Sequence, residues 1–459
     1  MRAVSSYDQE TESLEGLLSN IGSLGQSASG QDDISELRYL LIDCVSHTPL
    51  ISFRESSPSV ISAITRATVR AFLEGGYAEA DLEVEVLEKL YEITMMWAEK
   101  TPQNIRKKSS LLFNAAKCAK MLYDATKNTE WAKKDYDARI RNAEISIVLS
   151  EIEKASYSNS FAGDSAKIVF EATKDILWAE RWYEAKVTAG NLIVDFDRKN
   201  AAHNFDSSGE SAKKLFKLTQ GLNWAEMWYE SKKISGDLFS DYDKGAASYN
   251  LSSAGDAARA IFLRTREVKW AERGYEAKLA SADLRKDIQP EKSALDYECV
   301  GEIAEKLFEL TRDAEWLIES NLAYGLSADI FKESGKEIKA ARSYSRMGRT
   351  FMKLYYQTRD IQYAHNWHEC SEISSDIGER IDKECAAISR FYAGNAATQL
   401  FERTNIREWK IAALSHYSKF ERLCKGIKGE DIKGMLDSAK RSIGYIHSIS
   451  RQGGINPKK

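Results

Sequence analysis

The feature that most constrains this chain is a segment that returns at a nearly constant interval. The segment WAERWYEAKVTAG begins at Trp178, and it returns as WAEMWYESKKISG at Trp224 and as WAERGYEAKLASA at Trp270. Weaker copies complete a set of seven anchor residues, namely Trp131, Trp178, Trp224, Trp270, Trp316, Tyr363 and Trp409. Successive anchors lie 46 or 47 residues apart. A fixed period of this length predicts an array of one repeated structural unit, which grows by stacking.

Other residue types recur at fixed distances from the anchors. Every copy has an aliphatic residue nine positions before the anchor, an aromatic residue eight before and a threonine five before. The threonines are Thr126, Thr173, Thr219, Thr265, Thr311, Thr358 and Thr404. Fifteen positions before the anchor stands a glycine column, made of Gly163, Gly209, Gly255, Gly301, Gly348 and Gly394, with Ala116 in the first copy. These columns predict that every unit packs in the same way.

Hydrophobic periodicity divides each unit into two helices. The segment before the anchor, here called the leading helix, gathers its small and apolar residues on one arc, which is typical of an amphipathic helix. The segment from the anchor onward, the anchor helix, has two apolar arcs and should pack against two neighbours. The threonine, followed by a basic or polar residue, predicts the end of the leading helix. Because glycine within a helix costs about 1 kcal/mol relative to alanine, the glycine column predicts a close approach of a neighbouring backbone.

The repeat pattern also divides the chain. Residues 1–33 are rich in Ser, Gly and acidic residues, and we expect them to be mobile. Residues 34–104 are expected to form an N-terminal helical cap, with helices near 34–46, 58–74 and 81–98. The repeats should occupy 105–450, closed by a helix near 430–450, and 451–459 should be a loose tail.

The composition favours an all-α protein and argues against several functions. The chain contains five prolines in 459 residues, 29% charged residues and a net charge of −4. This charge gives no reason to expect nucleic acid or an anionic membrane as a partner. The six cysteines are scattered without CxxC spacing, and we interpret them as reduced thiols. We therefore expect a cytoplasmic protein. The sequence contains neither a phosphate-binding loop nor a nucleophile elbow, so we expect no enzyme activity and no cofactor.

The small residues of the repeat resemble those of the tetratricopeptide superfamily, in the long-helix form of kinesin light chains and SNAP adaptors. The resemblance covers residues 105–450. It depends on the small pairs Ala189-Gly190, Ser235-Gly236, Ser281-Ala282 and Ser327-Ala328, the alanines Ala202, Ala294 and Ala341, and the second small pairs Ser208-Gly209 and Ala254-Gly255. The 46-residue period differs from that family's 34, and the proline that commonly ends its unit is missing. The resemblance implies a right-handed α-solenoid of about seven helix-turn-helix repeats that binds proteins; HEAT-type hairpins are the alternative fold.

The anchor helices carry a strip of carboxylates. Counted from the anchor, position 6 gives Glu184, Glu230 and Glu276, and position 13 gives Asp237, Asp283, Asp329 and Asp376. A solvated face would account for such a strip. The family resemblance implies that this helix lines a concave groove, in which case the strip is a site for a basic or amide-rich peptide. Position 8 is basic in four copies (Arg139, Lys186, Lys232 and Lys278), and we interpret these side chains as structural, each paired with a carboxylate.

The sequence also contains one weak candidate for a metal site. His365, Glu369, Glu372 and Asp376 share one helix face, and His368 is adjacent. Metal sites need three or four converging ligands, which one helix seldom supplies.

From the repeat pattern and the acidic strip, we predict a protein- or peptide-binding scaffold with an acidic groove. The alternatives are a self-assembling structural subunit and an α-helical enzyme with a metal near His365.

Overall fold

The computed structural model describes residues 61, 64–65, 80–427 and 430–452, and over these residues it contains helices and no strand. The helices in order are α5 (Ala80–Lys100), α6 (Ile105–Thr126), α7 (Thr129–Val148), α8 (Ile152–Thr173), α9 (Ile176–Ile193), α10 (Arg198–Thr219), α11 (Leu222–Phe239), α12 (Lys244–Thr265), α13 (Val268–Arg285), α14 (Pro290–Thr311), α15 (Glu315–Glu333), α16 (Glu337–Thr358), α17 (Ile361–Ile381), α18 (Lys383–Thr404), α19 (Arg407–Leu423) and α20 (Glu430–Gln452). Helix α5 matches the last expected cap helix, and α20 matches the expected closing helix. The segment 1–33, expected to be mobile, the expected cap helix at 34–46, all of the expected cap helix at 58–74 except residues 61 and 64–65, and tail residues 453–459 lie outside the described residues.

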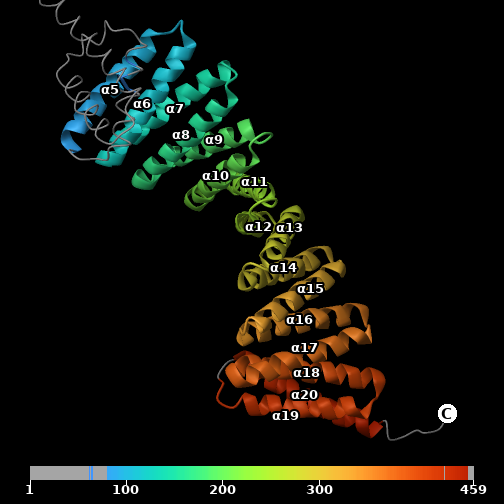
Figure 1. Cartoon of the computed structure of the whole chain (residues 1–459). Helices are drawn as coiled ribbons and strands as arrows, with labels where there is room; N and C mark the ends of the chain where they lie inside the picture. The colour runs from blue at the N-terminus through green and yellow to red at the C-terminus, as the bar shows by residue number, and fades with distance from the viewer. Residues whose placement is uncertain (1–60, 62–63, 66–79, 428–429, 453–459) are drawn as a thin grey trace, which may run out of the picture. The chain divides into compact units, whose positions relative to one another are not determined.

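The chain divides into two compact units, residues 1–238 and 239–459. Within each unit, helices follow one another side by side, each packed on the one before it and the one after it (Figure 1). The anchors stand at the starts of α7, α9, α11, α13, α15, α17 and α19, and the leading helices alternate with them. Each unit is therefore an α-solenoid of stacked helical hairpins, as the repeat period predicted.

The threonine column ends the leading helices. Each leading helix is 22 residues long and has the threonine as its last residue. The residue after the threonine adopts the left-handed conformation, with φ between 52° and 61°, and its N–H donates to the carbonyl of the aromatic residue eight before the anchor. The threonine hydroxyl connects the two helices: Thr173 Oγ1 donates to Val169 O over 2.8 Å and accepts from the Asp175 N–H over 3.2 Å. The repeated helix end is thus fixed by local hydrogen bonds.

The aliphatic column forms the interior of each unit, and its side chains are at most 1% exposed. Anchor tryptophans join one repeat to the next. Tyr136 packs edge-on against Trp178 at a centroid distance of 5.4 Å, and Tyr275 packs in the same way against Trp316 at 5.3 Å. The tyrosine at position 5 of one anchor helix therefore contacts the anchor of the following one. Tyr91 of α5 makes the same edge-on contact with Trp131, so the described part of the cap continues this packing.

The glycine column has a different cause from the one that the sequence suggested. A Cβ at Gly163, Gly209 or Gly255 would lie 2.7–2.8 Å from the Cγ of a lysine at position 8 of the following anchor helix. At Gly301 and Gly394 the ring of a position-8 tyrosine occupies the same place. The expectation of a close backbone was therefore wrong for these five positions, because a long side chain lies across each glycine; at Gly348 the nearest atom is Ser371 Oγ, at 3.1 Å. A backbone does come close at Gly378, where a Cβ would lie 3.0 Å from Ala386 N.

Candidate functional site

The predicted carboxylates are all exposed on the anchor helices. Glu184, Glu230 and Asp237 belong to the first unit, and Glu276, Asp283, Asp329 and Asp376 belong to the second. The position-13 aspartates also accept hydrogen bonds from within the chain. Tyr344 Oη donates to Asp329 Oδ1 over 2.9 Å, and the Tyr297 hydroxyl donates to Asp283. These aspartates therefore join an anchor helix to the leading helix that follows it, in addition to facing solvent.

The basic residues at position 8 are structural, as the sequence indicated, and they do not pair with the acidic strip. Lys186, Lys232 and Lys278 are each at most 5% exposed, and each ends at carboxylates of the preceding leading helix. Lys278 Nζ lies 2.7 Å from Asp256 Oδ1 and 3.3 Å from Asp296 Oδ1. Burial acts to lower the pKa of Lys278, but these two carboxylates outweigh it and raise the pKa. Burial lowers the pKa of Lys186, which Asp164 offsets only in part.

The strip is interrupted on α15 by an apolar surface that the sequence analysis missed. Positions 2, 6 and 10 of this anchor helix are Ile318, Leu322 and Leu326, which are 42%, 58% and 37% exposed. They line a hollow of about 380 Å³ together with side chains of α16 and α17, among them Phe351 and Tyr363. Asp329 also lines it. The signal was present in the sequence, because positions 2 and 6 hold glutamates in the three preceding repeats.

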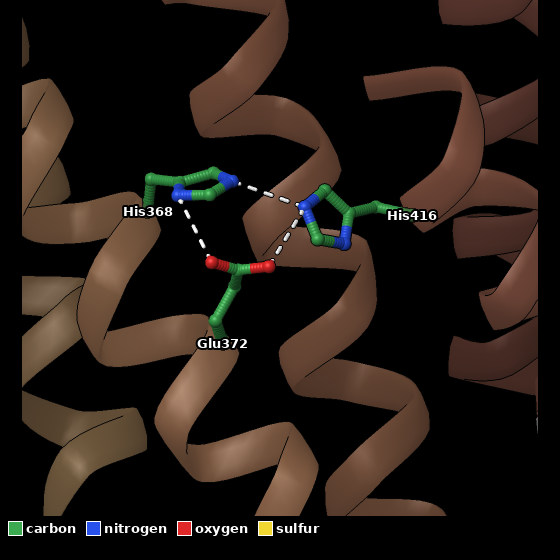
Figure 2. A group of neighbouring side chains, drawn as sticks. All are labelled: His368, Glu372 and His416. Carbon is green, nitrogen blue, oxygen red and sulfur yellow. Dashed lines mark hydrogen bonds and ion pairs between the residues drawn. The ribbon is translucent and has the colours of Figure 1, made fainter. Parts of the chain in front are cut away.

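A second cluster brings together His368, Glu372 and His416, as Figure 2 shows. His368 and Glu372 lie four residues apart on α17, and His416 lies on α19. The two imidazoles meet at Nε2, with the nitrogens 3.0 Å apart. Glu372 lies beneath both rings, with Oε2 3.5 Å from His368 Nδ1 and Oε1 3.5 Å from His416 Nε2.

The residues of this cluster differ from those that the sequence suggested for a metal site. Of the four residues that share the expected helix face, only Glu372 belongs to it, together with the adjacent His368. His365 instead packs edge-on against Trp409 at 5.1 Å, and Glu369 is exposed. A reading of one helix face missed His416 because the residue comes from the next anchor helix, 48 residues away.

A buried arginine completes the surroundings of the histidines. Arg390 of α18 is 2% exposed, and its guanidinium pairs with Asp376 and with Glu379 Oε1, the latter at 3.1 Å. Its Nη1 lies 3.4 Å from His416 Nδ1. Burial, followed by the effect of His365 and Arg390, lowers the pKa of His368 to about 4; burial, followed by His368, Arg390 and Lys419, lowers that of His416 to about 3. Both imidazoles are therefore neutral at neutral pH.

Comparisons with known proteins found solved structures at low similarity and no match by sequence. No family model matches the sequence, and no curated protein matches it. Among solved structures, a signal transduction ATPase with a tetratricopeptide repeat sensor from Pyrococcus horikoshii is 13% identical, with a TM-score of 0.33. The alignment covers 93% of this chain and 66% of that chain, so this chain spans slightly less than two thirds of that protein's length.

Two further alignments cover nearly the whole length of the other protein. A circular tandem repeat protein is 15% identical over 97% of this chain and 100% of its own, with a TM-score of 0.26. A Rap protein complexed with competence and sporulation factor is 13% identical over 85% of this chain and 99% of its own, with a TM-score of 0.20. Within the described residues, no helix is long and apolar enough to cross a membrane.

Proposed function

We propose that this protein is a scaffold without catalytic activity, and that it binds a protein partner through an extended or helical segment with apolar and basic side chains. The observation that carries the proposal is the hollow on α15. Three exposed aliphatic side chains line it together with Asp329. Exposed apolar side chains gathered in a hollow are typical of protein interaction sites.

The carboxylates of the second unit support a partner with basic residues. Glu276 and Asp283 lie on α13, and Asp376 lies on α17, the anchor helices before and after α15. A segment that places an apolar side chain in the hollow would carry lysine or arginine toward these carboxylates. In this proposal the anchor helices line the binding groove. Exposed charge pairs are screened over roughly 8 Å at physiological salt, so binding should weaken as salt rises.

The proposal can be tested with defined peptides and the full chain. The probes are fluorescein-labelled peptides of about twelve residues with leucines at helical spacing, in one series separated by lysines and in the other by glutamines. Fluorescence anisotropy should show tighter binding of the lysine series, with a larger loss between about 50 and 300 mM salt, over which the Debye length falls about 2.4-fold.

Matched substitutions distinguish binding at the hollow from nonspecific binding to exposed apolar side chains. Leu322→Gln should weaken binding of both series, whereas Glu276→Gln with Asp329→Asn should weaken the lysine series alone. Leu263→Gln is the control, because Leu263 of α12 is 54% exposed, nearly as much as Leu322, and does not line the hollow. Equal binding of both series, or equal losses for Leu263→Gln and Leu322→Gln, would refute the proposal.

A further inference from the structure

We propose that His368, Glu372 and His416 bind one divalent transition-metal ion, for which zinc is the natural probe, and that this ion joins α17 to α19. Two imidazole nitrogens and one carboxylate form a ligand set of the borderline class that suits Zn²⁺. The proposal is independent of peptide binding at the hollow, because none of the three residues lines it.

The positions of the donor atoms fit one ion. The three residues offer ligand atoms that all lie within 4.8 Å of one another. Zinc–nitrogen bonds of about 2.0–2.1 Å at tetrahedral angles place two ligand nitrogens roughly 3.3 Å apart. The two Nε2 atoms are 3.0 Å apart, so a small rotation of the imidazoles would open the required space. Glu372 Oε1, 3.5 Å from His416 Nε2, is already close to the position of a third ligand.

The two anchor helices supply what one helix cannot. His368 and Glu372 are one turn apart on the same face of α17, and His416 approaches from α19 of the next repeat (Figure 2). The imidazoles are buried, while the Glu372 side chain is 42% exposed, so an ion can enter from the side of the carboxylate. Three protein ligands leave a fourth coordination position for water.

Arg390 is compatible with the ion because other carboxylates hold its charge. Its guanidinium pairs with Asp376 and Glu379, and its distance to His416 Nδ1, 3.4 Å, is longer than the 3.1 Å to Glu379. A metal on His416 Nε2 places the remaining ring proton on Nδ1, facing this guanidinium. Arg390 Nη1 also lies 3.8 Å from Glu372 Oε1, so with the ion bound Arg390 would give up its longer contacts with the ring and with Glu372 and keep those with Asp376 and Glu379.

An independent observation is that the cluster consists of departures from the repeat. Position 5 is tyrosine in the first four repeats and varies in the last three, where it is Asn321, His368 and Leu414. Position 7 is alanine, serine or cysteine in every other repeat, and His416 replaces it. Position 9 carries a carboxylate in the repeat of Glu372 alone. Three departures that meet at one point indicate a local role beyond the packing that the repeat needs.

The departures also supply variants that should fold. His416→Ala restores the alanine of Ala138, Ala185 and Ala277, and His368→Tyr restores the tyrosine that packs on the next anchor. Glu372→Gln keeps the shape of the side chain while weakening it as a ligand. His447→Ala is the control, because His447 is exposed on α20 and outside the cluster.

The experiment uses the full chain, treated with a chelator and dialysed, at neutral pH. Calorimetric titration with Zn²⁺ should show one ion per chain, and Co²⁺ should develop visible absorption with the same stoichiometry. The wild-type thermal midpoint should rise with Zn²⁺, because a ligand that binds the native state stabilises it. His416→Ala and Glu372→Gln should each lower the affinity by more than about tenfold and reduce the thermal shift.

Two results would overturn the proposal. One is a wild-type chain that binds neither ion. The other is a His368→Tyr/His416→Ala chain that keeps wild-type affinity, since binding would then come from the cysteines or the surface. Circular dichroism of each variant establishes that loss of binding is not loss of fold, and His447→Ala should bind as the wild type does.

Discussion

Substitution of Gly255 tests how a long buried side chain determines the glycine column. An ideal Cβ at Gly255 would lie 2.7 Å from Lys278 Cγ and 3.1 Å from its Cδ and Cε. Favourable carbon–carbon contacts need about 3.5–4.0 Å, so the lysine stem would have to move by nearly 1 Å. It is held at both ends, by α13 at its Cα and by Asp256 and Asp296 at Nζ. Gly255→Leu should therefore destabilise the protein by about 2–3 kcal/mol.

The effect of the lysine can be separated from that of the glycine. Gly255→Ala should cost about 1 kcal/mol net, since overpacking exceeds the gain of about 1 kcal/mol in helix propensity. In a Lys278→Ser background, which reproduces the Gly348–Ser371 pairing of a later repeat, Gly255→Ala should instead be neutral or stabilising. Gly434→Ala is the control, because nothing lies within 4 Å of its Cβ position, and it should stabilise by about 0.5–1 kcal/mol.

Urea unfolding followed by circular dichroism gives the free energies for this cycle. The reasoning would be refuted if Gly255→Ala had the same effect with and without Lys278. It would also be refuted if the Gly255→Leu midpoint equalled that of the wild type.

Three further predictions concern other contacts of the repeat. Thr173→Val should destabilise by about 1 kcal/mol, because it removes the hydrogen bonds to Val169 O and from Asp175 N, whereas Thr173→Ser should keep most of them; urea midpoints of the two variants check this. Tyr275→Phe should cost about 1 kcal/mol through loss of the 2.6 Å hydrogen bond to Glu319, while Tyr275→Ala, which also removes the ring from Trp316, should cost about 3–5 kcal/mol in the same assay. The contributions of Lys186 and Lys278 to the free energy of unfolding should change with pH in opposite directions. The pKa of Lys186 is lowered in the folded state, so wild-type stability relative to Lys186→Met should rise as pH increases toward 10.5. The pKa of Lys278 is raised in the folded state, so wild-type stability relative to Lys278→Met should stay level up to pH 10.5 and fall above it. The free energy of unfolding should be measured from about pH 8 to 11. Equal slopes of the two stability differences against pH would contradict the prediction.

Much of the fold was predictable because its determinants are local and repeated. The threonine column predicted where the leading helices end, and the hydrogen bonds that end them join residues two to four positions apart. The period predicted stacked hairpins, since each unit must bury the same columns against its neighbours. The position-8 lysines were correctly interpreted as paired structural residues, because a charge between two apolar arcs needs a partner.

The sequence by itself therefore determined the helices, their ends and the repeating core, all of which depend on contacts within one unit or between identical neighbours. Only the tertiary structure decided what crosses between helices at particular points. It placed Lys278 across Gly255, where the pattern had suggested a backbone, and His416 of α19 against His368 and Glu372 of α17. The physical reason is that periodicity assigns a residue to a helix face, whereas a contact between two helices also depends on their separation and rotation, which the packing of all their side chains determines.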